Sequence, residues 1–341
     1  MKDNNLYLKK LEFELKKSYN KNYTDVCLTY AKKLLENKLP VIFDFEHLSL
    51  LLGIEKNKLS AFIFGNETKM YKKVLIPKKG RGNREILVPS NTLKYIQRWI
   101  LENILNNIKI SEFAKGFEKN ISIVDNAKVH LNQKCIINMD LKNFFPTINI
   151  DSVFRIFNYY GYTKEISFIL SKICTYKGKL PQGSPASPKI ANIVCLRLDK
   201  RISKLCEKYD AKYTRYADDI TISGNKGIEN IIKIVREIIK DEGFFVNNQK
   251  TRFAYNNKRQ EVTGLNINSG KVTISKKYKR EIKQEIYYCQ KYGVENHLEH
   301  IGCNKAFYKE HLYGKVYFVN MVEPNIAKKL LNELEKINWE Y

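Results

Sequence analysis

Apolar and polar residues alternate in several short stretches of this chain, whereas helical spacing dominates between them. Alternation with a period of two, in stretches rich in β-branched and aromatic residues, predicts half-buried strands. Alternation is clearest in residues 220–223 and 261–268, whereas residues 71–77, 84–88 and 213–216 are predicted to be strands from their β-branched and aromatic residues and the turns beside them. A mainly apolar run from residue 136 predicts a buried strand that ends at Asp140. The pattern therefore predicts short strands, several of them paired as hairpins, within a largely helical chain.

Apolar residues at helical spacing predict amphipathic helices over much of the remaining chain. These are one or two helices in residues 1–38, then helices over 43–54, 93–108, 151–160, 163–174, 189–206, 228–240 and 325–339. Asp44 suits the start of the second of these regions and Gly53 suits its end. Pro188 suits a first helical turn. A strand, a helix and a strand interleaved with the 213–223 hairpin form a split βαβ arrangement, so the predicted fold class is α+β.

Composition places the chain among globular proteins that act on an anionic partner. Its 341 residues, 43% of them hydrophobic, are enough for two or three subdomains. A formal net charge of +24 favours nucleic acid as the partner. A membrane surface is the alternative, but no apolar run approaches the ~20 residues that span a bilayer, and the start of the chain lacks a signal-peptide core. We therefore expect a cytoplasmic protein that does not bind a membrane.

Cysteine and histidine usage excludes two common classes of small structural site. The seven cysteines are scattered, odd in number and without a Cys-x-x-Cys pair. The five histidines show no metal-ligand spacing. The sequence therefore predicts neither a disulfide framework nor a zinc site.

Three aspartates provide the candidate chemistry. Asp218 and Asp219 lie at the tip of the predicted 213–223 hairpin, where adjacent like charges are unfavourable without a cation. Taken alone, this pair is also compatible with an ordinary solvated turn. Asp140 adds a third carboxylate at the end of a buried strand. Acids on neighbouring strands can hold two magnesium ions that clamp the attacking and leaving oxygens of a phosphoryl transfer.

The order of the motifs resembles that of reverse transcriptases. Asp140 precedes Phe145 by five residues, Leu-Pro-Gln-Gly-Ser-Pro follows at residues 180–185, and Tyr-Ala-Asp-Asp follows at 216–219. Asn126-Ala127 with His130, and the triplet Val-Thr-Gly at 262–264, resemble the two signatures of bacterial retron reverse transcriptases. The resemblance extends from about residue 39 to the C-terminus, and five motifs in the correct order are a stronger signal than any one of them.

This resemblance implies a right-hand polymerase with fingers, a palm (split βαβ, RRM-like) and a helical thumb. The implied divisions are an N-terminal helical segment at 1–65, fingers at 66–135 with part of 147–185, a palm at 136–268 and a thumb at 269–341. The implied catalytic residues are Asp140, Asp218, Asp219 and Lys250. The implied ligands of two Mg²⁺ ions are Asp140, Leu141, Asp218 and Asp219.

The same resemblance implies further binding residues. Those for the nucleotide are Lys78 (or its neighbour Lys79), Arg84, Phe145 and Gln182. Those for RNA recognition are Asn126, His130, Val262, Thr263, Gly264, Lys276, Lys277 and Arg280. Each has a structural alternative. The lysines suit a solvated face or a basic turn, Phe144 or Phe145 suits the core, and Asn126 and His130 suit a helix cap and a satisfied core histidine.

The implied function is that of a retron RNA-directed DNA polymerase. It would copy part of a cognate structured noncoding RNA (msr-msd) from the 2′-hydroxyl of a guanosine, using dNTPs. The resulting branched RNA-DNA hybrid (msDNA, containing the cDNA) would act with a retron effector protein in antiphage defence. The alternatives are a group II intron-like or other bacterial reverse transcriptase, and a catalytically inactive RNA-binding protein. The end of the chain at Tyr341, without maturase or nuclease segments, favours the retron, and the three intact acids argue against an inactive protein.

Overall fold

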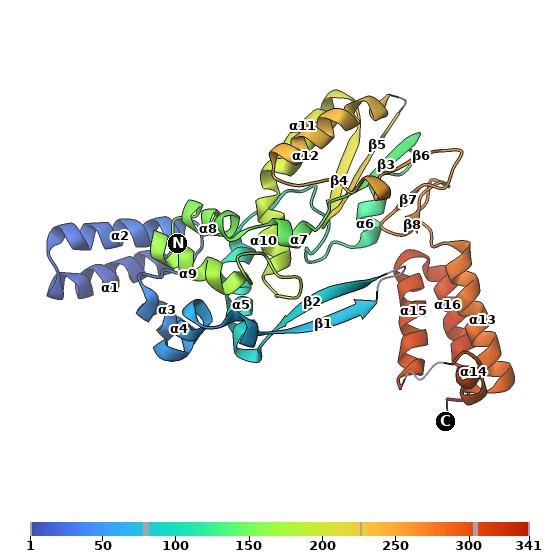
Figure 1. Ribbon diagram of the computed structural model, residues 1–341, viewed down its shortest axis with the longest axis horizontal. Coiled ribbons are helices and arrows are strands. Elements are labelled where there is room, and N and C mark those ends of the chain that lie inside the picture. Colours follow the sequence, from blue (N-terminus) through green and yellow to red (C-terminus); the bar gives the residue numbers. More distant parts are fainter. Residues whose placement is uncertain (1, 78–81, 226, 303–305, 340–341) are drawn as a thin grey trace. The chain divides into compact units, whose positions relative to one another are not determined.

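The computed structural model of the chain describes residues 2–77, 82–225, 227–302 and 306–339 (Figure 1). The chain divides into two compact units, each built from separate segments. Unit 1 comprises Met1–Phe117, Leu141–Arg201 and Arg236–Phe245. Unit 2 comprises Glu118–Asp140, Ile202–Val235 and Val246–Tyr341. Within the described residues, no helix is both long enough and apolar enough to cross a membrane.

Unit 1 begins with four helices. They are α1 (Lys2–Ser18), α2 (Lys21–Glu36), α3 (Phe45–Leu52) and α4 (Lys56–Phe64), followed by the 3₁₀ turn η1 (Glu67–Lys69). The Asp44 side chain accepts a hydrogen bond from the backbone of His47 at the start of α3, and Gly53 ends the helix with φ 62°. Both predicted boundaries of this helix are therefore confirmed.

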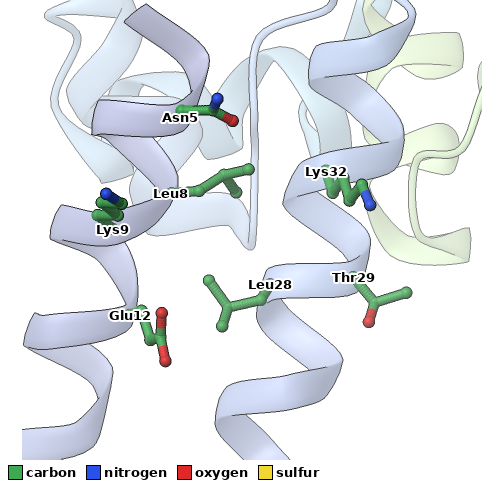
Figure 2. Close-up of a pocket in the computed structure, with 7 residues that line it drawn as sticks. All are labelled: Asn5, Leu8, Lys9, Glu12, Leu28, Thr29 and Lys32. Carbon is green, nitrogen blue, oxygen red and sulfur yellow. The ribbon is translucent and has the colours of Figure 1, made fainter. Parts of the chain in front are cut away.

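A hollow of about 490 Å³ separates the first two helices. Figure 2 shows Leu8 of α1 and Leu28 of α2 pointing toward one another across it. No described residue of α1 is fully buried, so this helix is attached mainly through its partly covered side facing α2.

The predicted basic hairpin is present in unit 1. β1 (Tyr71–Pro77) and β2 (Asn83–Pro89) pair in antiparallel register from Tyr71 opposite Pro89 to Pro77 opposite Asn83. The helix α5 (Asn91–Asn103) follows. It ends before the predicted limit of residue 108, and the 3₁₀ turn η2 (Leu105–Asn107) continues the chain.

The rest of unit 1 is helical. It contains α7 (Phe144–Thr147), α8 (Ile150–Tyr159), α9 (Lys164–Cys174), α10 (Ser187–Val194) and the beginning of α11 (Leu196–Lys208). The prediction of a single helix over residues 189–206 is wrong, because Cys195 leaves helical geometry with ψ 2°. The apolar spacing continues through this residue, so sequence periodicity could not reveal the break. Pro188 lies in the first turn of α10, as predicted.

Unit 2 is built on a four-stranded antiparallel sheet. Its strands are β3 (Cys135–Asp140), β4 (Lys212–Tyr216), β5 (Asp219–Gly224) and β6 (Arg252–Tyr255), in the order β4-β5-β3-β6 (Figure 1). Between β5 and β6 the chain forms η3 (Ile228–Ile231), α12 (Ile232–Asp241), which belongs to unit 1 from Arg236 onward, and η4 (Asn248–Lys250). Placing the first strand between the third and the fourth is the split βαβ arrangement, which confirms the prediction.

One hydrophobic core joins the remaining elements of unit 2. It combines α6 (Ile123–Lys128), the hairpin β7 (Glu261–Val262) and β8 (Leu265–Asn266), and the helices α13 (Lys276–Tyr292), α14 (Val294–His300), α15 (Tyr308–Val322) and α16 (Pro324–Leu334). Ile136 of the sheet belongs to the same core. The last helix ends at Leu334, earlier than the predicted limit of residue 339.

Candidate active site

Three aspartates meet at one end of the unit 2 sheet. Asp140 is the last residue of β3 and lies directly opposite Asp219, the first residue of β5. Asp218 belongs to the two-residue turn between β4 and β5. Its neighbour Ala217 has φ 58°, a conformation that costs energy for a residue with a side chain. The fully buried Arg215 holds this turn, because its Nη1 donates a hydrogen bond to the carbonyl of Ala217 at 3.2 Å.

Lys250 provides a positive charge next to Asp140. Its Nζ lies 2.7 Å from Oδ2 of Asp140, and the hydrogen bond with Asp140 raises the pKa of the lysine. The backbone supports the pair, since the N–H of Asn247 donates to the carbonyl of Asp140 at 2.7 Å and the N–H of Lys250 donates to that of Asn247 at 3.1 Å. The structure therefore brings together all four residues predicted to be catalytic.

The carboxylates carry more negative charge than Lys250 neutralises. Protein atoms around its carboxyl group raise the pKa of Asp219 to about 6, and the carboxylates of Asp218 and Asp140 add to this rise. Lys250 acts in the opposite direction. Asp219 as a whole stays exposed at the start of β5, so solvent weakens these effects. Surplus charge of this sign favours a bound cation.

Asp219→Asn should therefore stabilise the metal-free protein at pH 7. The pKa of this carboxyl is higher in the folded protein than its ordinary 3.8, so stability falls as pH rises from about 4 to about 6. The full shift corresponds to about 3 kcal/mol, and solvent screening of an exposed group reduces this to about 1 kcal/mol. Thermal melting with a chelator should show a higher melting temperature for the variant at pH 7 and none of this difference at pH 4. A lower melting temperature for the variant at pH 7 would contradict the claim that the ionised Asp219 carboxylate destabilises the folded protein.

The donor atoms suit a hard divalent cation, although the side chains do not converge on one point. Carboxylate oxygens are the ligands that magnesium prefers. Among the residues that the structure describes, no group of three or more His, Cys, Asp or Glu side chains is arranged to hold a metal ion. Asp140 instead directs Oδ2 to Lys250. The residues thus fit a divalent cation in chemistry and charge.

The aromatic residues after Asp140 lie in unit 1 and differ in exposure. Asn143 has φ 50° and precedes the short helix α7. Phe144 is buried and its ring lies 5.6 Å from that of Phe244. Phe145 is only half-buried, and its ring lies 6.1 Å from that of Phe117. Of the two phenylalanines, Phe144 is therefore the core residue and Phe145 keeps an accessible ring.

The loop before α10 is fixed on the unit 1 hairpin. The carbonyl of Gln182 accepts a hydrogen bond from the backbone of Leu87 in β2 at 2.8 Å. Gly183 has φ 133°, and a Cβ atom there would collide with the carbonyl of Leu87, so only glycine fits. Arg84 is exposed on the same strand. Gln182 and Arg84 thus belong to one assembly, whereas Lys78 and Lys79 lie outside the described residues.

The predicted RNA-recognition residues fall into a buried and an exposed group. Asn126, His130 and Val262 are buried, and the amide of Asn126 lies 3.5 Å from Oγ1 of Thr263. Thr263 and Gly264 form the two-residue turn between β7 and β8 with φ of 46° and 83°. Lys276, Lys277 and Arg280 are exposed on α13. Sequence reasoning did not separate these groups.

Exposed residues further along α13 extend this basic face. Lys291 lies 5.6 Å from the ring centre of Tyr287 and 5.1 Å from that of Tyr292. Both tyrosines are about half exposed, at 51% and 52%. The helix therefore presents cations at its start and aromatic rings near its end.

The structure also contains polar residues near the carboxylates that sequence reasoning missed. Thr214, Thr221 and Ser223 lie on the hairpin that carries Asp218 and Asp219, and Asn138 lies two residues before Asp140. All four make side-chain hydrogen bonds within unit 2. The available signal was their spacing, since residues at even separation from an acid share its face of the strand.

Comparison with known proteins identifies the family. The family model "Reverse transcriptase (RNA-dependent DNA polymerase)" matches residues 76–279. The Retron Ec86 reverse transcriptase of Escherichia coli is 35% identical in an alignment of 308 positions that covers 89% of this chain and 92% of that protein. The Retron Mx162 reverse transcriptase of Myxococcus xanthus is 31% identical in an alignment of 335 positions that covers 88% of this chain and 68% of that protein. Telomerase from Candida albicans in complex with the TWJ fragment of telomeric RNA is a similar solved structure, with 13% identity and a TM-score of 0.46 over 78% of this chain and 61% of that one.

The family model covers more than half of the chain, and the identity to a retron enzyme extends over nearly all of it. Both findings confirm the expected family, and the observed sheet agrees with the expected right-hand polymerase fold. The chain belongs to the bacterial retron reverse transcriptases and is an RNA-directed DNA polymerase.

Proposed function

We propose that this polymerase copies part of a dedicated structured RNA encoded beside its gene, starting from the 2′-hydroxyl of a guanosine in that RNA. The product is a branched RNA-DNA hybrid, the msDNA of retrons, which acts with an effector protein in antiphage defence. The observation that carries the proposal is 35% identity to a retron reverse transcriptase over 89% of this chain. The retron-like residues Asn126, His130 and 262–264 support it.

The carboxylates of unit 2 are the proposed chemical centre. Asp140, Asp218 and Asp219, with Leu141 beside the first of them, would hold two Mg²⁺ ions. These residues would hold ions whose chemistry is to activate the primer hydroxyl and to offset the charge of the departing pyrophosphate. Lys250 stays protonated because its hydrogen bond with Asp140 raises its pKa. It is therefore suited to neutralise the charge of the leaving group, whereas giving up its proton would first require the bond with Asp140 to be released.

The incoming dNTP would be held by residues of unit 1. Arg84 is exposed on β2, and its planar guanidinium suits the oxygens of a triphosphate. Gln182 lies in a loop whose backbone is fixed to the same strand, so it would contact the base and sugar from a rigid support. Phe145 would lie beneath the sugar. Lys78 belongs to the same proposed set from outside the described residues.

The cognate RNA would be recognised by exposed residues of unit 2. The turn at Thr263 and Gly264 is partly exposed, and the β-branched Thr263 adopts a φ of 46° that is unfavourable for its residue type. Strain of this kind is often retained at functional positions. Cations along α13, at Lys276, Lys277 and Arg280, would contact RNA phosphates, and the rings of Tyr287 and Tyr292 would stack on unpaired bases.

We propose that the boundaries of the fingers, palm and thumb are those expected from the sequence. Residues 66–135, with part of 147–185, form the fingers, 136–268 the palm and 269–341 the thumb, after a helical segment at 1–65. The palm range holds nearly all of the four-stranded sheet, and the thumb range holds α13, α14, α15 and α16. We further propose that the enzyme acts in the cytoplasm, where its RNA is made.

A single 2′-deoxyguanosine in the RNA should abolish synthesis if it replaces the branching residue. The RNA is transcribed from the DNA flanking the gene, and each unpaired guanosine is replaced in turn. At one position the DNA product covalently attached to RNA should fall by about a hundredfold or more, because the attacking hydroxyl is absent. Extension of oligo(dT) on poly(rA) by the same enzyme is the control. Full synthesis with every substitution would refute priming from a guanosine 2′-hydroxyl.

A further inference from the structure

A layer of polar side chains lies directly beneath the carboxylates, on the same face of the sheet. Residues two apart on a strand share a face. Asp219, Thr221 and Ser223 therefore share one face of β5, and the register places Asp140 opposite Asp219 and Asn138 opposite Thr221. Such polar side chains are costly to bury unless they are hydrogen-bonded.

His130 joins the two strands of the carboxylate hairpin within this layer. It is 0% exposed, its Nδ1 lies 2.6 Å from Oγ of Ser223 and its Nε2 lies 2.8 Å from Oγ1 of Thr214. Thr214 lies four residues before Asp218, and Ser223 lies four residues after Asp219. Burial lowers the pKa of His130 to about 3, so the ring is neutral at physiological pH. A neutral ring donates from one nitrogen and accepts at the other, and hydroxyl groups satisfy both.

Asn138 extends the layer to the next strand and to the β7–β8 hairpin. Its Oδ1 accepts a hydrogen bond from Oγ1 of Thr221 at 3.1 Å, and its Nδ2 donates to the carbonyl of Glu261 at 3.0 Å. The layer thus connects β4, β5, β3 and β7 through side chains. We use "polar layer" for its five residues, which are His130, Asn138, Thr214, Thr221 and Ser223.

We propose that His130 is a positioning residue for DNA synthesis on every template, and that the polar layer fixes the carboxylates against one another. His130 bonds to β4 four residues before Asp218 and to β5 four residues after Asp219, so it ties together the two strands that carry the turn. Asn138 does the same for β3 and Asp140. Fully hydrogen-bonded buried networks favour one arrangement of their strands. A displacement of reacting groups by about 1 Å can lower a rate by about a hundredfold.

This role differs from the direct RNA recognition expected from the retron signature at Asn126 and His130. His130 has no exposed surface, and Asn126 is only 1% exposed. Both ring nitrogens of His130 are already used within the protein. His130 therefore acts on the geometry of the carboxylates, whereas Asn126 lies against Thr263, in the partly exposed turn at Thr263 and Gly264 that would contact the RNA.

The test removes the hydroxyl partners and leaves His130 in place. Thr214→Val and Ser223→Ala should each lower kcat for oligo(dT) extension on poly(rA) by about tenfold to a hundredfold. They should lower synthesis on the RNA transcribed from the flanking DNA by the same factor. The KM for dTTP and the affinity for that RNA should change less than about twofold, since a positioning defect acts on kcat. Thr175→Val is the matched control, because Thr175 is a buried threonine of unit 1 whose hydroxyl donates to the carbonyl of Ser171 at 2.9 Å.

Two conservative variants separate the two hydrogen bonds of His130. Asn at this position can replace Nδ1 and keep Ser223 as its partner, whereas Gln can replace Nε2 and keep Thr214. His130→Asn and His130→Gln should each retain more of the kcat than His130→Ala. All rates are measured well below the melting temperature of each variant.

The proposal is overturned if the variants lose synthesis only on the flanking RNA, because His130 would then select the RNA. It is also overturned if kcat is unchanged, or if the loss equals the fraction of protein that is unfolded. The inference rests on the proposed role of Asp140, Asp218 and Asp219. Full activity of Asp140→Asn would refute that role, whereas an inactive Asp140→Asn with an unaffected Thr214→Val would refute this inference alone.

Discussion

Asp140→Asn and Asp218→Asn should each lower DNA synthesis by at least about a thousandfold without unfolding the protein. Each variant loses a carboxylate that we propose holds a divalent cation. Such a cation stabilises the transition state by several kcal/mol, and each loss of about 1.4 kcal/mol lowers the rate tenfold. Stability should respond differently. Asp218→Asn relieves the repulsion between this residue and Asp219. Asp140→Asn relieves repulsion too, but it also loses the ion pair with Lys250. Because that lysine is largely exposed, the ion pair contributes at most about 1 kcal/mol to stability.

Primer extension on poly(rA) and thermal melting should be measured on the same preparations. Asp25→Asn, on the exposed surface of α2, is the matched control for removing one carboxylate. Activity within tenfold of the original enzyme in either active-site variant would refute the assignment of these carboxylates as metal ligands. A large drop in melting temperature would show that the variant had lost its fold and not only its chemistry.

Phe145→Val should admit ribonucleotides. We propose that the ring lies beneath the nucleotide sugar, where it would collide with a 2′-hydroxyl, the group that distinguishes the two sugars. Its partly exposed ring, in contact with Phe117 and Phe144, is consistent with this role. Removing a steric barrier of this size should lower the preference for dUTP over UTP by up to about a hundredfold, measured as the ratio of kcat/KM values on poly(rA).

Phe144→Ala is the control for loss of an adjacent ring. Phe144 is buried against Phe244, so its truncation should cost about 3–5 kcal/mol of stability and leave the preference for deoxynucleotides intact. If Phe144→Ala relaxes that preference and Phe145→Val does not, the barrier lies one residue earlier than proposed.

Local patterns in the sequence were sufficient for most of the elements. The β-branched residues on both sides of a glycine-containing turn predicted the 71–89 hairpin, and the alternation at 220–223 next to a Tyr- and Thr-rich stretch predicted the 213–223 hairpin, because these signals involve only neighbouring residues. Asp44 and Gly53 marked the ends of α3 because a helix cap involves groups only a few residues apart. The break at Cys195 and the end of α16 at Leu334 left no such signal, since apolar spacing continues past both.

The sequence by itself determined the strands, the caps and the presence of three acids, since each depends on neighbouring residues. Only the tertiary structure decided which residues meet. The register of β3 and β5 places Asp140 opposite Asp219, and a shift of one residue would turn every side chain of the strand to the other face. His130 bonds to Ser223 across 93 residues of sequence, and Asn126 contacts Thr263 across 137. No periodicity extends over such separations, so a histidine that sequence resemblance assigned to RNA recognition proved to be buried beneath the carboxylates.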